Sequence, residues 1–233
     1  MFVRGGGGEV AAKGQWRERW VVRFLVGCGL LVLSAASWAQ STPEKRPVPS
    51  QAALKAFTSP NGAFQFSYPA MLIFCELLQQ KNSDGYYWAQ PECSGYIPAC
   101  GNPGDLDQPV VCLAYPRNKH SDSPTFDAAT FSVWDTTQSE KDCLADSDRP
   151  LPPIIIRGVR FKGGESADAA MNRSRDTKGY SAFHNGRCYG LVVTVVTTNA
   201  GIFDSPVTEP TQQDWAEIKG RLEQARDSFE FLK

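Results

Sequence analysis

The residue pair that most resembles catalytic machinery in this 233-residue sequence is His184 and Cys188. An imidazole beside a thiol can act as the general base of a nucleophilic cysteine, provided that the two groups come within hydrogen-bond reach. Asn185-Gly186 lies between them, however, and this dipeptide is the preferred two-residue turn of a β-hairpin. The turn pairs His184 with Arg187, so that Cys188 faces the opposite side of the sheet from His184. We therefore interpret His184 as structural and Cys188 as half of a disulfide.

A metal site is the second chemical candidate. Cys93, Cys100 and His120 are residue types that bind zinc. The six residues between the two cysteines exceed the usual spacing of two to four, and an oxidising compartment favours disulfides instead. The acidic residues show no calcium-loop spacing, and no Gly-x-Ser-x-Gly elbow or phosphate loop is present. The sequence therefore predicts no catalytic residue, no metal and no cofactor.

The cysteines carry a stronger signal. Of seven, Cys28 lies in an apolar N-terminal segment, and six follow it: Cys75, Cys93, Cys100, Cys112, Cys143 and Cys188. An even number in an exported chain indicates a disulfide framework, although six cysteines allow 15 pairings that sequence alone does not distinguish. Our expected pairings are Cys93–Cys100, Cys75–Cys112 and Cys143–Cys188.

The N-terminal segment indicates export. Arg17, Arg19 and Arg23 precede the apolar run Phe24–Ala36, and Ser37-Trp38-Ala39 places small residues at the two cleavage positions. This order of basic, apolar and small residues is that of a signal peptide. The run is shorter than the roughly 20 residues of a membrane-spanning helix. We predict that residues 1–39 are a signal peptide cleaved after Ala39, which places the protein in the periplasm or outside the cell, with no stable membrane span.

Two alternatives for this segment stay open. Leu25–Cys28 resembles a lipoprotein box, in which Cys28 would carry the lipid, but Leu30–Leu33 continue the apolar region beyond it. An uncleaved anchor is the other alternative, and the short apolar run disfavours it.

Composition limits the partners of the remaining chain. Residues 1–39 contain five basic and two acidic residues, so that the rest carries a net charge of −4 when the whole chain carries −1. A mildly acidic chain without a basic stripe argues against nucleic acid as a partner. The Pro-rich residues 40–53 are typical of a flexible lead-in, and residues 54–233 have the length of a single domain.

Alternating patterns and turn signals predict a mainly antiparallel sheet. Ser59–Gly62 suits a type I turn, and the alternation of Phe64, Phe66 and Tyr68 with polar residues predicts a strand with an aromatic inner face. Thr137 and Glu140 form a capping-box pattern before a short helix that runs through Cys143. Further strands are expected at 71–78, 110–115 and 125–134, with a strand pair or a bent strand around Gly158 at 154–161 and a hairpin at 180–198.

Two elements predict layers on both faces of this sheet. Leu191–Val196 is apolar on both alternating faces, which indicates a central strand covered on both sides. From Asp214, apolar residues recur every three or four positions (Trp215, Ile218, Leu222, Ala225 and Phe229), the stripe of a helix packed on a core, and Thr211 with Asp214 can cap it. We predict an α+β fold, an α/β/α sandwich around a central, mainly antiparallel sheet held by disulfides.

Three segments carry a resemblance to a known family. The opening FTSPNGAFQFSYP (Phe57–Pro69), the strand Ala129–Trp134 and the ending DSFEF (Asp227–Phe231) resemble the PsbP-like superfamily of small α/β/α sandwich domains. The resemblance implies that residues 54–233 form one such domain and that the protein is a binding or assembly factor, not an enzyme. The six cysteines depart from the usual pattern of that family.

One stretch remains as a candidate binding site. Residues 83–108 are rich in Gly, Pro and aromatic residues, and they include Tyr86, Tyr87, Trp88 and Tyr96 between cysteines. Aromatic residues on a covalently held loop offer contact area at low entropic cost, but they can equally cover one end of the sheet. We therefore favour an exported, non-enzymatic binding domain for a protein or carbohydrate ligand. A thiol- or metal-dependent enzyme and a structural envelope component are the alternatives.

Overall fold

The computed structural model describes residues 53–79, 86–88, 90–100 and 109–232. The predicted signal peptide, and the predicted lead-in apart from Ala53, lie outside them. The elements in chain order are β1 (Leu54–Thr58), β2 (Phe64–Pro69), β3 (Ile73–Gln79), β4 (Tyr86–Trp88), η1 (Pro91–Tyr96), α1 (Ile97–Cys100), β5 (Pro109–Ala114), η2 (Arg117–His120), β6 (Phe126–Thr136), α2 (Glu140–Cys143), β7 (Pro150–Ile156), β8 (Val159–Ala170), β9 (Arg173–His184), β10 (Arg187–Thr198), η3 (Ala200–Ile202), α3 (Gln212–Asp227) and β11 (Glu230–Phe231).

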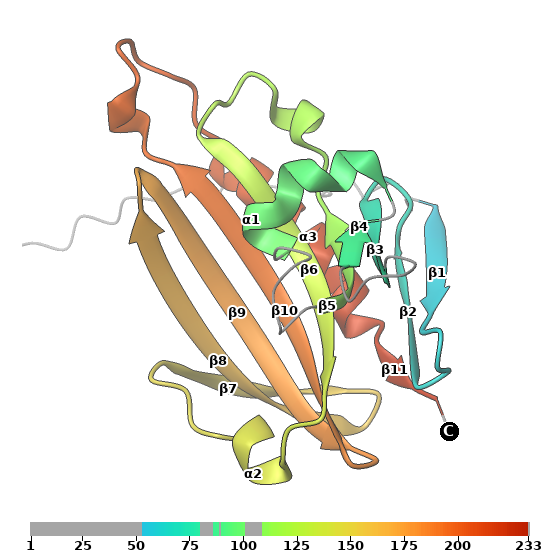
Figure 1. Ribbon diagram of the computed structural model, residues 1–233. Helices are drawn as coiled ribbons and strands as arrows, with labels where there is room; N and C mark the ends of the chain where they lie inside the picture. Colours follow the sequence, from blue (N-terminus) through green and yellow to red (C-terminus); the bar gives the residue numbers. More distant parts are fainter. Residues whose placement is uncertain (1–52, 80–85, 89, 101–108, 233) are drawn as a thin grey trace, which may run out of the picture. The chain divides into compact units, whose positions relative to one another are not determined.

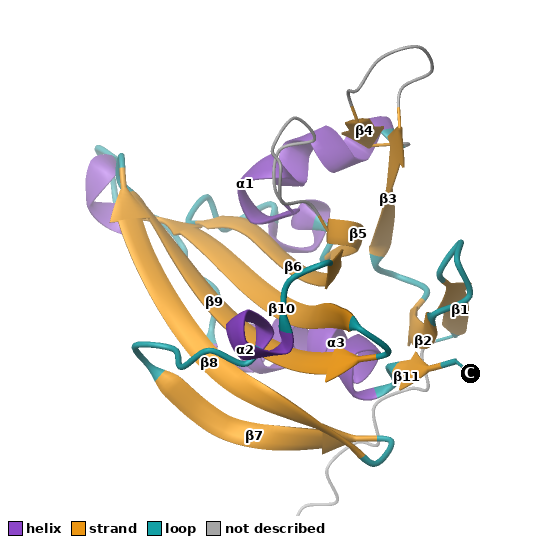
Figure 2. Ribbon diagram, turned by 60° about the horizontal axis from the view of Figure 1, so that its bottom comes forward, coloured by secondary structure: helices purple, strands orange, loops and turns teal. Residues whose placement is uncertain are grey.

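An antiparallel sheet of eight strands forms the centre of the fold, in the order β4-β3-β5-β6-β10-β9-β8-β7 (Figure 1). Strand β10 lies between β6 and β9 and is a central strand, as its apolar sequence predicted. Helix α3 lies on one face of the sheet, and α1 and α2 lie on the other (Figures 1 and 2). The predicted α+β class with helices on both faces of an antiparallel sheet is therefore confirmed.

A second, three-stranded sheet of order β1-β2-β11 completes the layer that contains α3. The predicted turn joins β1 and β2, with a hydrogen bond of 2.8 Å from the Gly62 N–H to the Ser59 carbonyl. The alternation along β2 buries Phe64, Phe66 and Tyr68, as the sequence predicted. This small sheet thus presents an aromatic face to the main core.

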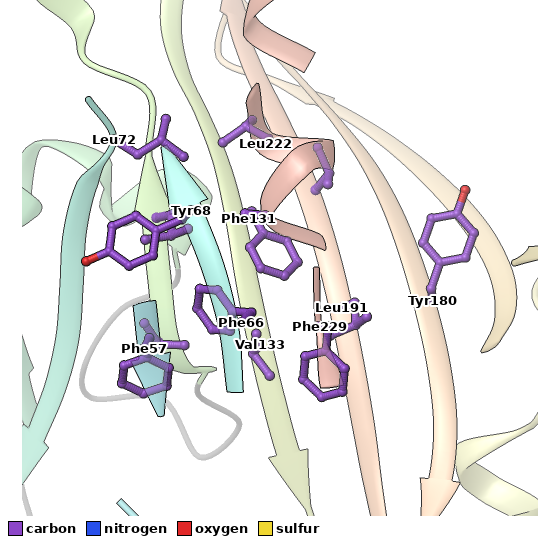
Figure 3. Packing of buried hydrophobic residues seen from close by; sticks show 14 of the residues in the cluster. Phe57, Phe66, Tyr68, Leu72, Phe131, Val133, Tyr180, Leu191, Leu222 and Phe229 are labelled. Carbon is purple, nitrogen blue, oxygen red and sulfur yellow. The ribbon is translucent and has the colours of Figure 1, made fainter. Parts of the chain in front are cut away.

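The main core lies between the two sheets and α3, where side chains from all three meet (Figure 3). Phe66 of β2 meets Phe131 of β6 edge to face, with ring centroids 5.7 Å apart. Leu222 of α3 and Leu191 of β10 are fully buried in the same cluster. Each such side chain contributes about 1.5–3 kcal/mol on burial, which fixes α3 against the sheet.

Helix α3 begins as the sequence predicted. The Thr211 hydroxyl accepts a hydrogen bond from the Asp214 N–H (3.2 Å), and the Asp214 carboxylate accepts one from the Thr211 N–H (2.8 Å). This capping box satisfies backbone donors that the first helical turn leaves without partners. Ile218 and Leu222 then bury the apolar stripe of the helix.

The hairpin of β9 and β10 has the predicted register. His184 pairs with Arg187, Phe183 with Cys188 and Ala182 with Tyr189. Asn185 and Gly186 adopt φ angles of 48° and 78°, the left-handed conformations that a two-residue turn of this kind requires.

One prediction about local structure is corrected, and one hairpin was not predicted. The prediction that Thr137 caps the short helix is wrong, because Ser139 is the N-cap of α2 and its hydroxyl accepts a hydrogen bond from the Asp142 N–H at 3.2 Å. The sequence interpretation also missed the long hairpin of β8 and β9. Its turn is formed by Met171 and Asn172, both at positive φ, and methionine is not a residue typical of such turns.

Candidate functional site

The six cysteines that follow Cys28 form three disulfides, and two of the predicted pairings are wrong. The bonds join Cys75 to Cys93 and Cys100 to Cys112, in place of the predicted Cys93–Cys100 and Cys75–Cys112. The predicted bond Cys143–Cys188 is confirmed.

The two corrected disulfides share one purpose in the fold. Cys75 of β3 and Cys112 of β5 are directly opposite each other in the sheet. Each forms a disulfide with a cysteine of the segment η1–α1. This segment packs on the face of the sheet away from α3 and shares a small core with Ala128 and Val196. The disulfides therefore fasten the outer layer to the sheet at both ends of that segment.

The predicted aromatic site is only partly described. Tyr86, Tyr87 and Trp88 form β4, which pairs with the end of β3 at the edge of the main sheet, and the description covers their backbone. Residues 83–85, 89 and 101–108 of the predicted loop lie outside the described residues. A binding role for these three aromatic residues remains a prediction.

Tyr96, the fourth residue of the predicted site, is part of the core. Its side chain is 4% exposed, and its hydroxyl accepts a hydrogen bond of 3.0 Å from the Arg117 N–H. Burial raises the pKa of the Tyr96 hydroxyl above its usual value, so the group stays protonated. Tyr96 thus joins the outer layer to η2 and offers no ring surface to a partner in this conformation.

The histidines and Cys188 do not form a catalytic pair. Cys188 is held in its disulfide with Cys143 and carries no thiol. The His184 ring stacks on Phe231, with ring centroids 4.1 Å apart, and His120 packs between Tyr115 and Phe126. Among the described residues, no group of three His, Cys, Asp or Glu side chains is placed to hold a metal ion.

A buried carboxylate joins three parts of the chain at one end of the sheet. Asp127 accepts hydrogen bonds from Arg117 (3.0 Å) and Thr198 (2.6 Å), and it forms a salt bridge of 3.1 Å with Arg173. These partners begin η2, end β10 and begin β9. The cluster satisfies the buried charge and holds the end of the long hairpin, which is a structural function.

A recess among the described residues lies between α3 and the long strands β8, β9 and β10. It has a volume of about 330 Å³, which is at the lower end of the range for ligand pockets. Its sheet side is lined by two rows of cross-strand neighbours, Glu165–Lys178–Val193 and Ala167–Asp176–Val195. Trp215, Lys219 and Glu223 of α3 form the opposite wall. We call this recess the α3 groove.

The α3 groove has an apolar strip between charged rims. Val193 and Val195 of β10 and the Trp215 indole of α3 provide the apolar surface. The rims carry basic and acidic side chains in equal number: Arg149, Lys178 and Lys219, and Glu165, Asp176 and Glu223. Of these six, only Glu223 takes part in a salt bridge among the described residues, with Arg226 at 3.7 Å. The other rim charges are available to a ligand.

Two contacts fix the position of the Trp215 ring in the wall of the α3 groove. Its ring meets Phe126 edge to face at a centroid distance of 5.8 Å, and the Lys219 ammonium lies 5.9 Å from the ring centroid. One edge of the indole therefore packs on the core while the ring borders the groove.

Sequence reasoning missed the α3 groove because it missed the hairpin of β8 and β9. Once that hairpin is known, its register places Glu165 beside Lys178 and Ala167 beside Asp176. Asp176 and Lys178, two positions apart, share one face of β9, but without the turn at Met171-Asn172 nothing indicated that β8 lies beside them.

No helix of the described residues is long and apolar enough to cross a membrane. Three disulfides are typical of proteins that fold in an oxidising compartment.

Comparison with known proteins yields similarities in structure only. No family model matches the chain, and no curated protein matches it. A protein from Bacteroides thetaiotaomicron VPI-5482 has a TM-score of 0.39 and 9% identity over 77% of this chain, which spans about half (48%) of that protein. Cyanobacterial PsbP from Synechocystis sp. PCC 6803 has a TM-score of 0.35 and 12% identity, covering 79% of this chain and 96% of PsbP.

A third solved structure is LpqN of Mycobacterium tuberculosis, a protein involved in cell envelope biogenesis. It has a TM-score of 0.32 and 8% identity, covering 79% of this chain and 93% of LpqN. The solved structures that this chain resembles thus include a PsbP protein, from the family that its sequence motifs resemble.

Proposed function

We propose that the protein is an exported, non-enzymatic binding domain whose α3 groove takes a small amphipathic ligand with both a cationic and an anionic group. The observation that carries this proposal is the apolar strip of Val193, Val195 and Trp215 between rims of both charges. The predicted signal peptide and the three disulfides support export.

The apolar strip supplies the affinity of such a ligand. Burial of apolar surface contributes about 25 cal/mol per Å², and Val195 and the Trp215 indole offer such surface above the buried Val193. The groove is bordered by well-ordered elements, since the central strand β10 and the capped helix α3 both pack into the core. A preformed site of this kind loses little free energy to ordering on binding.

The charged rims supply the selectivity. Lys219 on α3 and Lys178 on β9 can attract an anionic group, while Glu165 and Asp176 can attract a cationic one. Because both signs are present in equal number, a zwitterion matches the rims better than a ligand of one charge does.

Octylphosphocholine below its micelle concentration is a suitable probe, because it joins an apolar tail to a zwitterionic head. We expect NMR titration to shift the signals of Val193, Val195 and the Trp215 indole. A Val195→Glu substitution places a charge in the apolar strip and should weaken binding by about tenfold or more, since burying an unpaired charge is costly. Ile155→Glu is the matched control, because Ile155 is an exposed apolar residue (74%) on β7, outside the groove.

Two further outcomes decide the proposal. Octyl glucoside has the same tail without charges, and equal affinity for it would remove the role assigned to the rims. Equal binding by the Val195→Glu variant would place the site elsewhere. The predicted aromatic site is tested in parallel, because replacing Tyr87 and Trp88 by alanine should leave the titration unchanged if the α3 groove is the binding site.

A further inference from the structure

Strand β8 pairs with β9 along one side, and β7 covers only part of its other side. Strand β7 pairs with β8 from Ile156↔Val159 to Pro150↔Gly164. Strand β8 then continues to Ala170, paired with β9 on its other side alone. Among the described residues, the last backbone contact on the outer side is a hydrogen bond of 2.9 Å from the Glu165 N–H to the Arg149 carbonyl. We call the remaining five residues, Ser166–Ala170, the β8 edge.

The alternation of backbone direction along β8 shows which N–H and C=O groups point outward, away from β9. The N–H and C=O of one residue point to the same side of an antiparallel strand, and successive residues alternate. The Glu165 N–H points outward to Arg149, so Ala167 and Ala169 also point outward. Ser166, Asp168 and Ala170 point inward to β9. The β8 edge therefore presents two N–H groups and two C=O groups to an additional strand.

The side chains of the β8 edge do not obstruct such a strand. All five residues are exposed, and four of them are serine or alanine. Natural proteins usually protect exposed strand edges with proline, charges or bulges. Strand β7 follows that rule with Pro150, Pro152 and Pro153, whereas the β8 edge carries a single charged residue, Asp168.

Asp168 decides the kind of partner. Among the salt bridges of the described residues, none involves Asp168, although Arg175 is its cross-strand neighbour. Symmetric antiparallel pairing of two copies over this five-residue edge would centre on Asp168 and place the two carboxylates opposite each other, which is destabilising. A basic residue opposite Asp168 would be stabilising instead.

We propose that the β8 edge binds an extended peptide segment of another protein as an added strand, with a basic side chain opposite Asp168. Backbone hydrogen bonds to Ala167 and Ala169 hold the peptide, and Asp168 selects it. The proposal does not rest on the proposed function: Ala167 lines the α3 groove with its side chain, whereas the added strand pairs with the backbone along the outer side of β8, away from β9 and β10.

The probe is a capped heptapeptide, Thr-Val-Thr-Lys-Thr-Val-Thr, with a matched peptide that has glutamate at its centre. Amide hydrogen exchange of the ¹⁵N-labelled protein is measured by NMR with each peptide. We expect the lysine peptide to slow exchange at Ala167 and Ala169 and to leave Ser166 and Asp168 unchanged, because the latter amides already pair with β9. The lysine peptide should bind about threefold tighter or better than the glutamate peptide, and Asp168→Lys should reverse this order.

A double substitution of Ala167 and Ala169 by proline removes only outward N–H groups, which edge strands tolerate. It should abolish binding, while threonine at the same two positions should retain it. Unchanged thermal unfolding verifies that the proline variant folds, and Asp168→Lys provides a second test that leaves the backbone intact. Absence of alternating protection at millimolar peptide, or equal binding by the folded proline variant, would overturn the proposal. A concentration-dependent dimer that the proline variant loses would also overturn it, since a second copy would then occupy the edge.

Discussion

Cys75 and Cys112 face each other across β3 and β5, yet each forms its disulfide with the short helical segment that covers them. The bonds Cys75–Cys93 and Cys100–Cys112 therefore join two layers of the fold, where a Cys75–Cys112 bond would only have joined neighbours within one sheet.

This arrangement predicts that Cys75 and Cys112 stay unpaired when their partners are lost. The Glu76 N–H donates to the Gln90 side chain, away from β5, so by alternation Cys75 and Cys112 form a hydrogen-bonded pair of the sheet. The Cβ atoms of such a pair lie roughly 5.5 Å apart, beyond the roughly 3.5–4.5 Å that a disulfide spans. When Cys93 and Cys100 are replaced by serine, we expect peptide mapping without reduction to find free thiols at Cys75 and Cys112. A Cys75–Cys112 bond in this variant would contradict the register of β3 and β5.

The contacts of Asp127 predict that removing its carboxylate lowers the free energy of unfolding. Asp127→Ala removes the acceptor of Arg117, Arg173 and Thr198, and hydrogen bonds to charged groups contribute about 1.5–3 kcal/mol each. We expect urea unfolding to show a decrease of about 2 kcal/mol or more, with faster amide exchange at the start of β9. Asp122→Ala is the control, because Asp122 is exposed and should change stability by less than about 0.5 kcal/mol.

Two strand glycines should respond oppositely to alanine. A Cβ atom at Gly163 would lie 2.9 Å from both the Leu151 Cβ and the Tyr180 Cε1, whereas at Gly179 the nearest atom, of Val192, is 4.0 Å away. Gly163→Ala should therefore cost about 1–3 kcal/mol through overpacking. Gly179→Ala should be neutral or stabilise the protein by roughly 0.5 kcal/mol, because alanine restricts the unfolded chain. Thermal unfolding of both variants distinguishes the steric effect from the entropic one. An equal loss of stability in the two variants would contradict the close packing at Gly163.

The cap of α3 predicts a dependence on pH. The hydrogen bonds from the Thr211 hydroxyl and N–H hold the pKa of the Asp214 carboxyl below its usual value. A lowered folded-state pKa means that this contribution to stability is present above the unfolded pKa, near 4, and is lost as the pH falls through the lower folded value. Thr211→Ala should cost about 1 kcal/mol at neutral pH.

The effect of Thr211→Ala should shrink as the pH falls through the lowered folded-state pKa of Asp214 and its carboxylate becomes protonated. Urea unfolding over a series of pH values from neutral downward measures this. Thr208→Ala is the control, since Thr208 is exposed and precedes the helix. A difference between Thr211→Ala and wild type that stays constant with pH would show that Asp214 does not take part in the cap.

Much of the fold follows from local patterns that sequence contains. The Asn185-Gly186 turn predicts the register of β9 and β10 because few other dipeptides adopt positive φ at both positions. The spacing of Ile218 and Leu222 predicts α3 because only one face of a helix can meet the core. The hairpin at Met171-Asn172 escaped prediction because methionine rarely adopts the left-handed conformation observed there.

The candidate sites depend on contacts between distant residues. The sequence by itself determined that the cysteines pair and that residues 191–196 form a central strand, since parity and alternation are properties of the chain. Only the tertiary structure decided which cysteines pair, because each choice depends on which layer covers β3 and β5. The tertiary structure also brought Trp215 and Val195 together in the α3 groove and left Ala167 and Ala169 at an unpaired edge of β8. Both outcomes depend on how the strands and the helix pack in space, and no local sequence pattern encodes that packing.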